Sequence, residues 1–346
     1  MKVSQNSTYA MFTNMRQNMA SLQRELATAQ GEVTNGRVAD AGLLLGSGNG
    51  RRVSLLQDIQ RLQVVVDTNH LAQARVDMTL TSIDAVREHG ESILASLTSS
   101  LGSSTHFDVT QRAGQTALEA ITGVMNTSLN GEFIFGGINS GEEPIGDFET
   151  DGAKAALDAA FLGHFGFAKT DAAAAGIDGS AMTDFLDNVV EPMFFGAGWE
   201  ASFSNASDDV ITARIGLTET SDASVSANET GFRGMFFAAV VTAEYFSGDL
   251  NAAATSAAAE KALAVVATAS GQLADLQGRT GFLSNRIERT SDLLSARIDE
   301  ITAQSDKAVA VDPFEAATRL NNLVTQIETS YTLTGRLQQM SLMRYI

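Results

Sequence analysis

Apolar residues recur along residues 55–101 at alternating spacings of four and three, which is the pattern of a coiled-coil seam. Ten of the fourteen seam positions are Leu, Ile or Val, and no proline interrupts the stretch. A helix of this length extends for about 70 Å at about 1.5 Å per residue, so we expect other long helices to cover its seam. The positions are Leu55, Ile59, Leu62, Val66, Asn69, Gln73, Val76, Leu80, Ile83, Arg87, Gly90, Leu94, Leu97 and Leu101.

Both ends of the chain carry a similar pattern. Residues 1–35 place apolar side chains every three or four positions, opposite a polar face, which predicts an amphipathic helix. A second such helix is predicted from Pro313 to the last residue. Asp312 can cap it, Pro313 fits the first helical position, and Glu315 can reach back to the cap. The candidate assembly residues on the two helices are Met15, Leu22, Leu26, Leu320, Leu323, Ile327 and Leu337.

Two breaks flank the long helix. Residues 36–50 hold five glycines; this run lacks the Lys-Ser/Thr pair of a phosphate-binding loop and precedes a helix too long for a dinucleotide fold. We therefore expect a flexible joint there rather than a nucleotide site. A turn follows at residues 102–107, and then a third helix, which Asp108 can cap, to about Leu129. The turn dipeptide Asn130-Gly131 ends it, ahead of a predicted short strand at residues 133–135.

The helical period is lost between residues 140 and 250, where short aromatic runs alternate with glycines and a strand is predicted at residues 210–217. It returns at residues 251–269, which are rich in alanine, and the seam reappears at Ile287, Leu294, Ile298 and Ile301. These patterns predict a mainly α fold. Its long terminal helices form a coiled-coil or helical-bundle core, and a mixed α+β domain is inserted between them. Because one pair of helices cannot cover every seam, we expect copies of the chain to bundle.

Charge is unevenly distributed. The formal net charge is −18, and residues 140–250 hold 19 acidic and 4 basic residues, a net charge of −15. This balance argues against nucleic-acid binding, which needs a basic surface. It suits either a well-solvated exposed region or an ordinary acidic domain. No apolar run approaches the 18 residues of a membrane span, and residues 1–10 lack the apolar core of a secretory signal.

The sequence offers no convincing catalytic or metal site. Cysteine is absent, which excludes disulfides and thiolate chemistry. The four histidines, His70, His89, His106 and His164, show no ligand spacing. The adjacent pairs Glu142-Glu143 and Asp208-Asp209 could serve a metal or acid–base chemistry, but adjacent acids in an acidic region are usually just solvated. We expect no enzyme activity, cofactor or metal.

Three stretches resemble the flagellin superfamily. They are Thr34–Asp40 (TNGRVAD), Asn130–Gly137 (NGEFIFGG), where the chain would leave the helical domain, and Gln339–Met343 (QMSLM). The likeness covers roughly residues 1–140 and 270–346. It is closer to the hook-associated branch at the hook–filament junction, the third hook-associated proteins, than to filament subunits, because the typical flagellin ending is absent. The run Ala39–Gly46 departs from relatives, many of which are acidic there.

The resemblance implies an arrangement in layers. Residues 1–40 with 310–346 would form an inner terminal coiled-coil domain. Residues 41–138 with 251–309 would form a helical-bundle domain, and residues 139–250 an outer acidic domain. It also implies export through the flagellar type III channel and an extracellular place at the hook–filament junction. The implied partners are further copies in a tubular assembly, the first hook-associated protein, flagellin and an export chaperone.

Two alternatives stay open at this stage. A filament flagellin would share the same fold and differ in copy number. A secreted binding protein or enzyme would instead hold its activity in residues 140–250.

Overall fold

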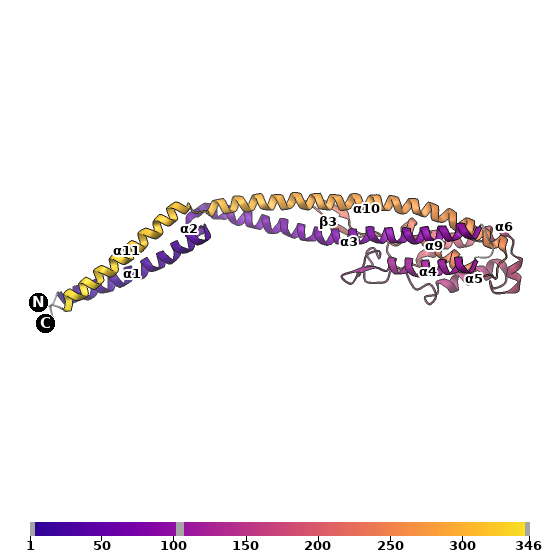
Figure 1. The fold of residues 1–346 in the computed structure, drawn as a ribbon, viewed down its shortest axis with the longest axis horizontal. Helices are drawn as coiled ribbons and strands as arrows, with labels where there is room; N and C mark the ends of the chain where they lie inside the picture. Colours follow the sequence, from indigo (N-terminus) through magenta and orange to yellow (C-terminus); the bar gives the residue numbers. More distant parts are fainter. Residues whose placement is uncertain (1–3, 102–106, 343–346) are drawn as a thin grey trace. The chain divides into compact units, whose positions relative to one another are not determined.

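The structure is a computed structural model that describes residues 4–101 and 107–342, without the side chains of residues 4–9, 44, 45, 47 and 337–342. The described chain forms two compact units, a terminal unit of residues 1–63 with 294–346 and a central unit of residues 64–293. Long helices dominate, and the described strands form two two-stranded sheets. The predicted mainly α fold is confirmed (Figure 1). The predicted three-part division into domains stays a prediction.

The terminal unit consists of helices. Helix α11 begins as predicted, because the Asp312 carboxylate accepts hydrogen bonds from the backbone N–H groups of Phe314 (2.8 Å) and Glu315 (3.4 Å). The unit contains α1 (Ser4–Asn35), α2 (Ala41–Leu45), a 3-10 turn (Gly46–Gly48), the first part of α3 (Asn49–Leu101), the last part of α10 (Ala252–Val309) and α11 (Pro313–Leu342).

The central unit combines the remainder of α3 and α10 with shorter elements. These are α4 (Phe107–Met125), β1 (Ser128–Leu129), β2 (Glu132–Phe133), α5 (Ala153–Phe165), the 3-10 turn η2 (Ala172–Gly176), α6 (Gly179–Phe185), the π-turn η3 (Leu186–Val190), α7 (Glu191–Phe195), α8 (Gly198–Ser202), β3 (Thr212–Arg214), β4 (Thr220–Asp222) and α9 (Thr230–Glu244).

Burial along α3 follows a heptad, but half of the predicted seam is displaced by one residue. The series that includes Leu62 is buried as predicted, and so is Val66, whereas the rest of the second series is displaced to the positions from Ala72 onward. Leu94 and Leu101, which were predicted in the seam, are exposed. The buried series of the helix passes instead through positions that include the small residues Ala72, Thr79 and Ser100. The buried positions are Leu62, Val65, Val66, Asn69, Ala72, Arg75, Val76, Thr79, Ser82, Ile83, Val86, Gly90, Ile93, Leu97 and Ser100.

Helices α3 and α10 pair antiparallel in the central unit. The Asn69 amide donates to Ser291 (3.0 Å) and the Gln73 amide to Ser284 (2.6 Å). Residue numbers therefore increase along α3 in the direction in which they decrease along α10. Asn69 also donates to the carbonyl of Ile215 (2.9 Å), which follows β3. Buried polar residues of this kind fix the register of paired helices. The β3–β4 hairpin therefore covers a part of the seam that we expected long helices to cover.

Helix α9 forms the core of the central unit. Nearly all of its residues are buried, and it lies beside α4 (Figure 1). Glycine permits this close approach: a Cβ on Gly114 of α4 would lie 2.6 Å from the backbone nitrogen of Ala243. The Gln111 amide also donates to the carbonyl of Ala243 (3.1 Å). The sequence analysis missed α9 because a helix buried on all sides shows no amphipathic period.

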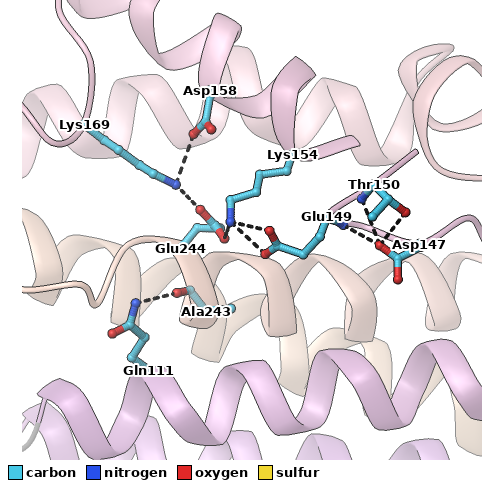
Figure 2. Close-up of polar contacts among 9 residues, drawn as sticks. All are labelled: Gln111, Asp147, Glu149, Thr150, Lys154, Asp158, Lys169, Ala243 and Glu244. Carbon is cyan, nitrogen blue, oxygen red and sulfur yellow. Dashed lines mark hydrogen bonds and ion pairs between the residues drawn. The ribbon is translucent and has the colours of Figure 1, made fainter. Parts of the chain in front are cut away.

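An ionic cluster ties α5 to the end of α9 (Figure 2). The buried carboxylate of Glu244 contacts the ammonium groups of Lys169 and Lys154, the second at 3.9 Å. Lys169 also pairs with Asp158 (3.1 Å), and Lys154 with Glu149 (2.6 Å). The hydrogen bond to Glu149 raises the pKa of Lys154. Because Glu244 is only 7% exposed, its charge depends on these partners.

The third predicted helix is shorter than expected. Helix α4 ends at Met125 rather than near Leu129, because Ser128 and Leu129 form strand β1, which pairs with β2. The predicted turn is confirmed: Asn130 and Gly131 both have positive φ, 54° and 85°. This is the geometry that Asn-Gly favours in two-residue hairpins.

Candidate assembly surface

Helices α1 and α11 lie side by side and run antiparallel (Figure 1). At one end of the contact the Thr334 hydroxyl donates to the Met15 sulfur (3.6 Å). At the other end Arg319 donates to Glu32 (3.3 Å). The pair therefore brings residues from the two ends of the sequence together, as the amphipathic patterns predicted.

Six of the seven predicted assembly residues have described side chains, and none of the six is fully exposed. Leu323 is buried, at 7% exposed. Met15, Leu22, Leu26, Leu320 and Ile327 are only half-buried. The side chain of Leu337 lies outside the described residues. Whether the seven residues carry assembly stays a prediction.

The most buried residues of the two helices are ones that the leucine spacing did not select. Ala29 and Ala316 are 2% and 1% exposed. Alanine lets two helix backbones approach closely, while larger neighbours splay toward the edges. Alanines in line with the leucines of an amphipathic helix are the signal that could have found them.

Apolar surface remains on the terminal unit after α1 and α11 have paired. Phe314 is 85% exposed and Tyr331 56% exposed on α11, and Met11 is 55% exposed on α1. Phe314 and Tyr331 lie about 25 Å apart along α11, so these side chains add separate apolar positions to the surface of the pair and do not form one continuous patch. Two helices in isolation leave their seam half covered.

The end of α1 is joined to the α10–α11 connection by a polar network. The buried carboxylate of Glu32 accepts from the N–H of Ala39 (3.1 Å) and from Arg319. The Val38 N–H donates to the carbonyl of Val309 (2.9 Å), and the Gly36 carbonyl accepts a hydrogen bond from the N–H of Val311. The first residues of the predicted flexible joint therefore have defined hydrogen bonds.

Gly36 allows the chain to turn at this point. Its φ is +66°, in the left-handed region that favours glycine. The neighbouring Arg37 pairs with Asp306 at 2.7 Å. Both connections of the terminal unit, from α1 onward and from α10 to α11, thus depend on one small cluster of contacts.

Ionisable groups in the described residues have structural roles. Backbone and side-chain hydrogen bonds from Thr150 lower the pKa of Asp147, and those from Ala181 and Ser180 lower the pKa of Asp178, which caps α6. Burial raises the pKa of Tyr245 well above its ordinary value. The described residues contain no group of three or more His, Asp or Glu side chains placed to hold a metal ion.

The histidines and acidic pairs of the sequence analysis do not converge. His164 faces Asp184 at 3.9 Å, and His106 lies outside the described residues. Asp208 accepts a hydrogen bond from Asn228 (2.8 Å), which makes it part of the loop structure. Among the described helices, none has an apolar stretch long enough to span a membrane.

Comparison with known proteins identifies both ends of the chain. Residues 7–140 match the bacterial flagellin N-terminal helical region, and residues 263–346 match the bacterial flagellin C-terminal helical region. Together the two matches cover more than half of the chain and include the α1–α11 pair. A search of curated protein sequences gave no match.

A solved structure shares the fold. It is a protein from Vibrio parahaemolyticus that is assigned to the flagellar hook-associated proteins. The match has a TM-score of 0.50 and 9% sequence identity, and covers 74% of this chain and 95% of that one. At this identity the likeness concerns the fold alone. With both terminal helical regions matched in their expected order, the chain belongs to the flagellin superfamily.

Proposed function

We propose that this chain is an adaptor at the junction between the flagellar hook and filament, and that it assembles through its terminal helices. Membership of the flagellin superfamily makes it a structural component of the bacterial flagellum. The fold shared with a protein assigned as hook-associated favours the junction. The role is mechanical, and we propose no enzymatic activity.

One observation carries the proposal: the α1–α11 pair leaves its own seam half covered. Leu22, Leu26 and Ile327 stay half-buried in the described pair, and Phe314 is almost fully exposed. Burial of apolar area stabilises association at about 25 cal/mol per Å². Neighbouring copies that complete this seam would therefore gain free energy from surface that a single chain cannot bury.

The adaptor needs different partners at its two axial ends. We propose the first hook-associated protein on the hook side and flagellin on the filament side, with an export chaperone bound to the C-terminal helix before assembly. The chain would act outside the cell, after export through the flagellar channel.

The assembly residues can be tested by replacing Leu323 and Ile327 together with Asp. Two charges at these positions would have to be buried when copies bundle, so we expect filaments to detach from hooks. The matched control replaces Asn322 and Gln326 with Asp, since both are exposed on the same helix at the same spacing of four. Normal anchoring of filaments in the Leu323/Ile327 variant would contradict the proposal.

Deletion separates the junction role from the alternative, a filament subunit. Loss of a junction adaptor leaves hooks without filaments and releases flagellin monomers into the medium. Loss of a filament subunit removes only its own band from purified filaments. Electron microscopy of the cells, with gel analysis of the medium, measures both outcomes.

A further inference from the structure

A cavity lies where the β3–β4 hairpin packs against α3 and α10 in the central unit (Figure 1). Ala223, which follows β4, is buried there with Val76 of α3 and Ile287 of α10. Beside this cluster the side chains leave a space of about 260 Å³. Pockets for drug-sized ligands measure about 300–1,000 Å³, so this cavity suits a smaller molecule.

The inner wall of the cavity is apolar. Val76, Ala223 and Leu276 line it, and each is at most 4% exposed. Phe282 of α10 also borders the cavity, but its ring is 70% exposed and therefore lies at the mouth. An exposed aromatic ring beside an apolar wall can cover one face of a bound molecule. A ligand of this cavity therefore needs an apolar face.

Two hydroxyl groups on the wall have unused donors. Thr280 is 5% exposed, and its hydroxyl forms no hydrogen bond to another described residue. The Ser224 hydroxyl accepts a hydrogen bond from the N–H of Ile211 (2.8 Å) but donates to no side chain or carbonyl in the described chain. Such groups bind either water or the oxygen atoms of a ligand. A ligand that carries hydroxyl groups can therefore replace this water without losing hydrogen bonds.

The charged residues that line the cavity balance one another. Two are positive, Arg279 and Arg286, and two are negative, Asp222 and Glu229. Arg279 pairs with Glu229 at 3.4 Å, and Arg286 pairs with Glu219. A cationic ligand would meet the two guanidinium groups, and an anionic ligand would meet the carboxylates, so like charges oppose both. The cavity therefore favours an uncharged ligand.

Polar groups at the mouth can still bind such a ligand. A guanidinium carries several N–H donors and a carboxylate several lone pairs, so one ion pair leaves part of each group free. Asp222 is exposed, and its carboxylate has no partner among the described side chains. The mouth thus offers hydrogen-bond donors and acceptors with no net charge.

We propose that this cavity binds an uncharged sugar in its pyranose form. A pyranose ring has a face of C–H groups that matches Phe282 and the apolar wall. Its hydroxyl groups both donate and accept, which matches Thr280, Ser224 and the groups at the mouth. The proposal goes beyond the adaptor role, because it gives the central unit a binding site of its own. A free sugar and the last residue of a glycan chain present the same ring.

Saturation-transfer NMR on the full chain tests the proposal, with glucose, galactose and mannose as the probes. We expect at least one of them to bind with a Kd of about 1–10 mM, which is typical of so small a ligand. Glucuronate and the ammonium form of glucosamine should bind at least about tenfold more weakly. Failure of all three neutral sugars to bind at about 50 mM, or equal binding of the charged sugars, would overturn the proposal.

Two variants locate the bound sugar. Phe282→Ala removes the exposed ring, and Thr280→Val replaces the hydroxyl by a methyl group of similar size. Each should raise the Kd about threefold to tenfold. Leu293→Ala is the matched control and should leave the Kd within about twofold, because Leu293 is also 70% exposed on α10 but does not line the cavity.

Circular dichroism establishes that each variant is folded. An unchanged Kd in both Phe282→Ala and Thr280→Val would place the sugar elsewhere and overturn the proposal, as would an equal loss of binding in Leu293→Ala.

A disaccharide that ends in the bound sugar separates the two sources of the ring. Binding of the disaccharide with a similar Kd supports recognition of a glycan, whereas binding of the monosaccharide alone supports recognition of a free sugar. The adaptor role is tested independently, because every residue that lines the cavity belongs to the central unit. Normal anchoring of filaments by Phe282→Ala, together with weaker sugar binding, would show that the two functions are separate.

Discussion

The terminal and central units are both built on long helices, but they bury those helices to different extents. In the central unit α9 is enclosed by its neighbours, and Phe232, Phe236 and Phe237 are at most 1% exposed. In the terminal unit the α1–α11 pair fully buries little beyond two alanines, Glu32 and Leu323. The central unit thus has a finished core within one chain, while the terminal unit has an apolar seam open to further helices.

This difference fits an assembly in which one part must fold alone and the other must wait for copies. A seam completed in the single chain would leave no apolar surface for neighbours to bury. A core left open in both units would expose the chain to aggregation. The structure divides these two requirements between the units.

The largest predicted effect comes from truncating one apolar side chain in each unit and comparing the two losses of stability. Phe237→Ala should lower the free energy of unfolding of the central unit by about 3–5 kcal/mol, because Phe237 is fully buried and packs against Phe194 at 5.2 Å between ring centroids. Leu26→Ala should cost the isolated chain much less, because Leu26 is only half-buried in the α1–α11 pair and has less packing to lose. The single tryptophan, Trp199, is buried in the central unit, so its fluorescence reports only that unit.

Circular dichroism then reports both units together. If Trp199 fluorescence shows that Phe237→Ala unfolds at the same temperature as the unaltered chain, the central core does not depend on this ring. An equally large effect of Leu26→Ala on the isolated chain would show that the terminal seam is already complete, which would contradict the comparison.

The next effect concerns charge in the central unit. Glu244→Gln should destabilise this unit by about 2–3 kcal/mol, because it removes the buried carboxylate and leaves Lys169 with the partly exposed Asp158 as its charged partner (Figure 2). Glu149→Gln is the matched control: it also contacts Lys154, but its side chain is 62% exposed. We expect it to cost less than about 1 kcal/mol. Chemical denaturation followed by Trp199 fluorescence measures both, and equal effects would contradict the role of burial.

The sequence predicted the long helices because their apolar spacing survives in any packing arrangement. It predicted only half of the α3 seam, because Ala72, Thr79 and Ser100 carry too little apolar surface to stand out while the exposed Leu94 and Leu101 do. Leucine spacing alone therefore fixes a helix better than it fixes which side faces inward.

Other parts depend on contacts that no local pattern encodes. Helix α9 is apolar on every side, so its sequence lacks the period that marks a surface helix. The polar residue Asn69 lies in the seam because its side-chain NH2 group donates to Ser291 and to the carbonyl of Ile215, and both are far away in sequence. In the candidate assembly surface, the leucines were predictable from spacing, whereas the burial of Ala29 and Ala316 was not.

A smaller effect is expected from adding one methyl group to α4. In Gly114→Ala the new Cβ would meet backbone atoms of Thr242 and Ala243 at 2.6–2.7 Å, so α4 and α9 must move apart at a cost of about 2 kcal/mol. Gly123→Ala on the same helix meets nothing within 4 Å and should stabilise by about 0.5–1 kcal/mol. Thermal melts of the two variants give opposite shifts if the close approach is real, and shifts of the same sign would count against it.

The smallest effect sharpens the comparison through pH. Tyr245 is 1% exposed, and its hydroxyl has no hydrogen-bond partner among the described residues. Tyr245→Phe should therefore stabilise the central unit by about 1 kcal/mol at neutral pH.

Burial raises the pKa of Tyr245 in the folded chain, so above pH 10 the unfolded chain loses this proton first. This titration therefore leaves the free energy of unfolding unchanged below pH 10. As the pH rises further, the free energy of unfolding falls by at most about 1.4 kcal/mol per pH unit. Tyr331→Phe in the terminal unit is the control, because Tyr331 is 56% exposed. Denaturation between pH 8 and about 11 should show a flatter alkaline decline for Tyr245→Phe alone, and parallel curves for both variants would rule out the buried phenol as its source.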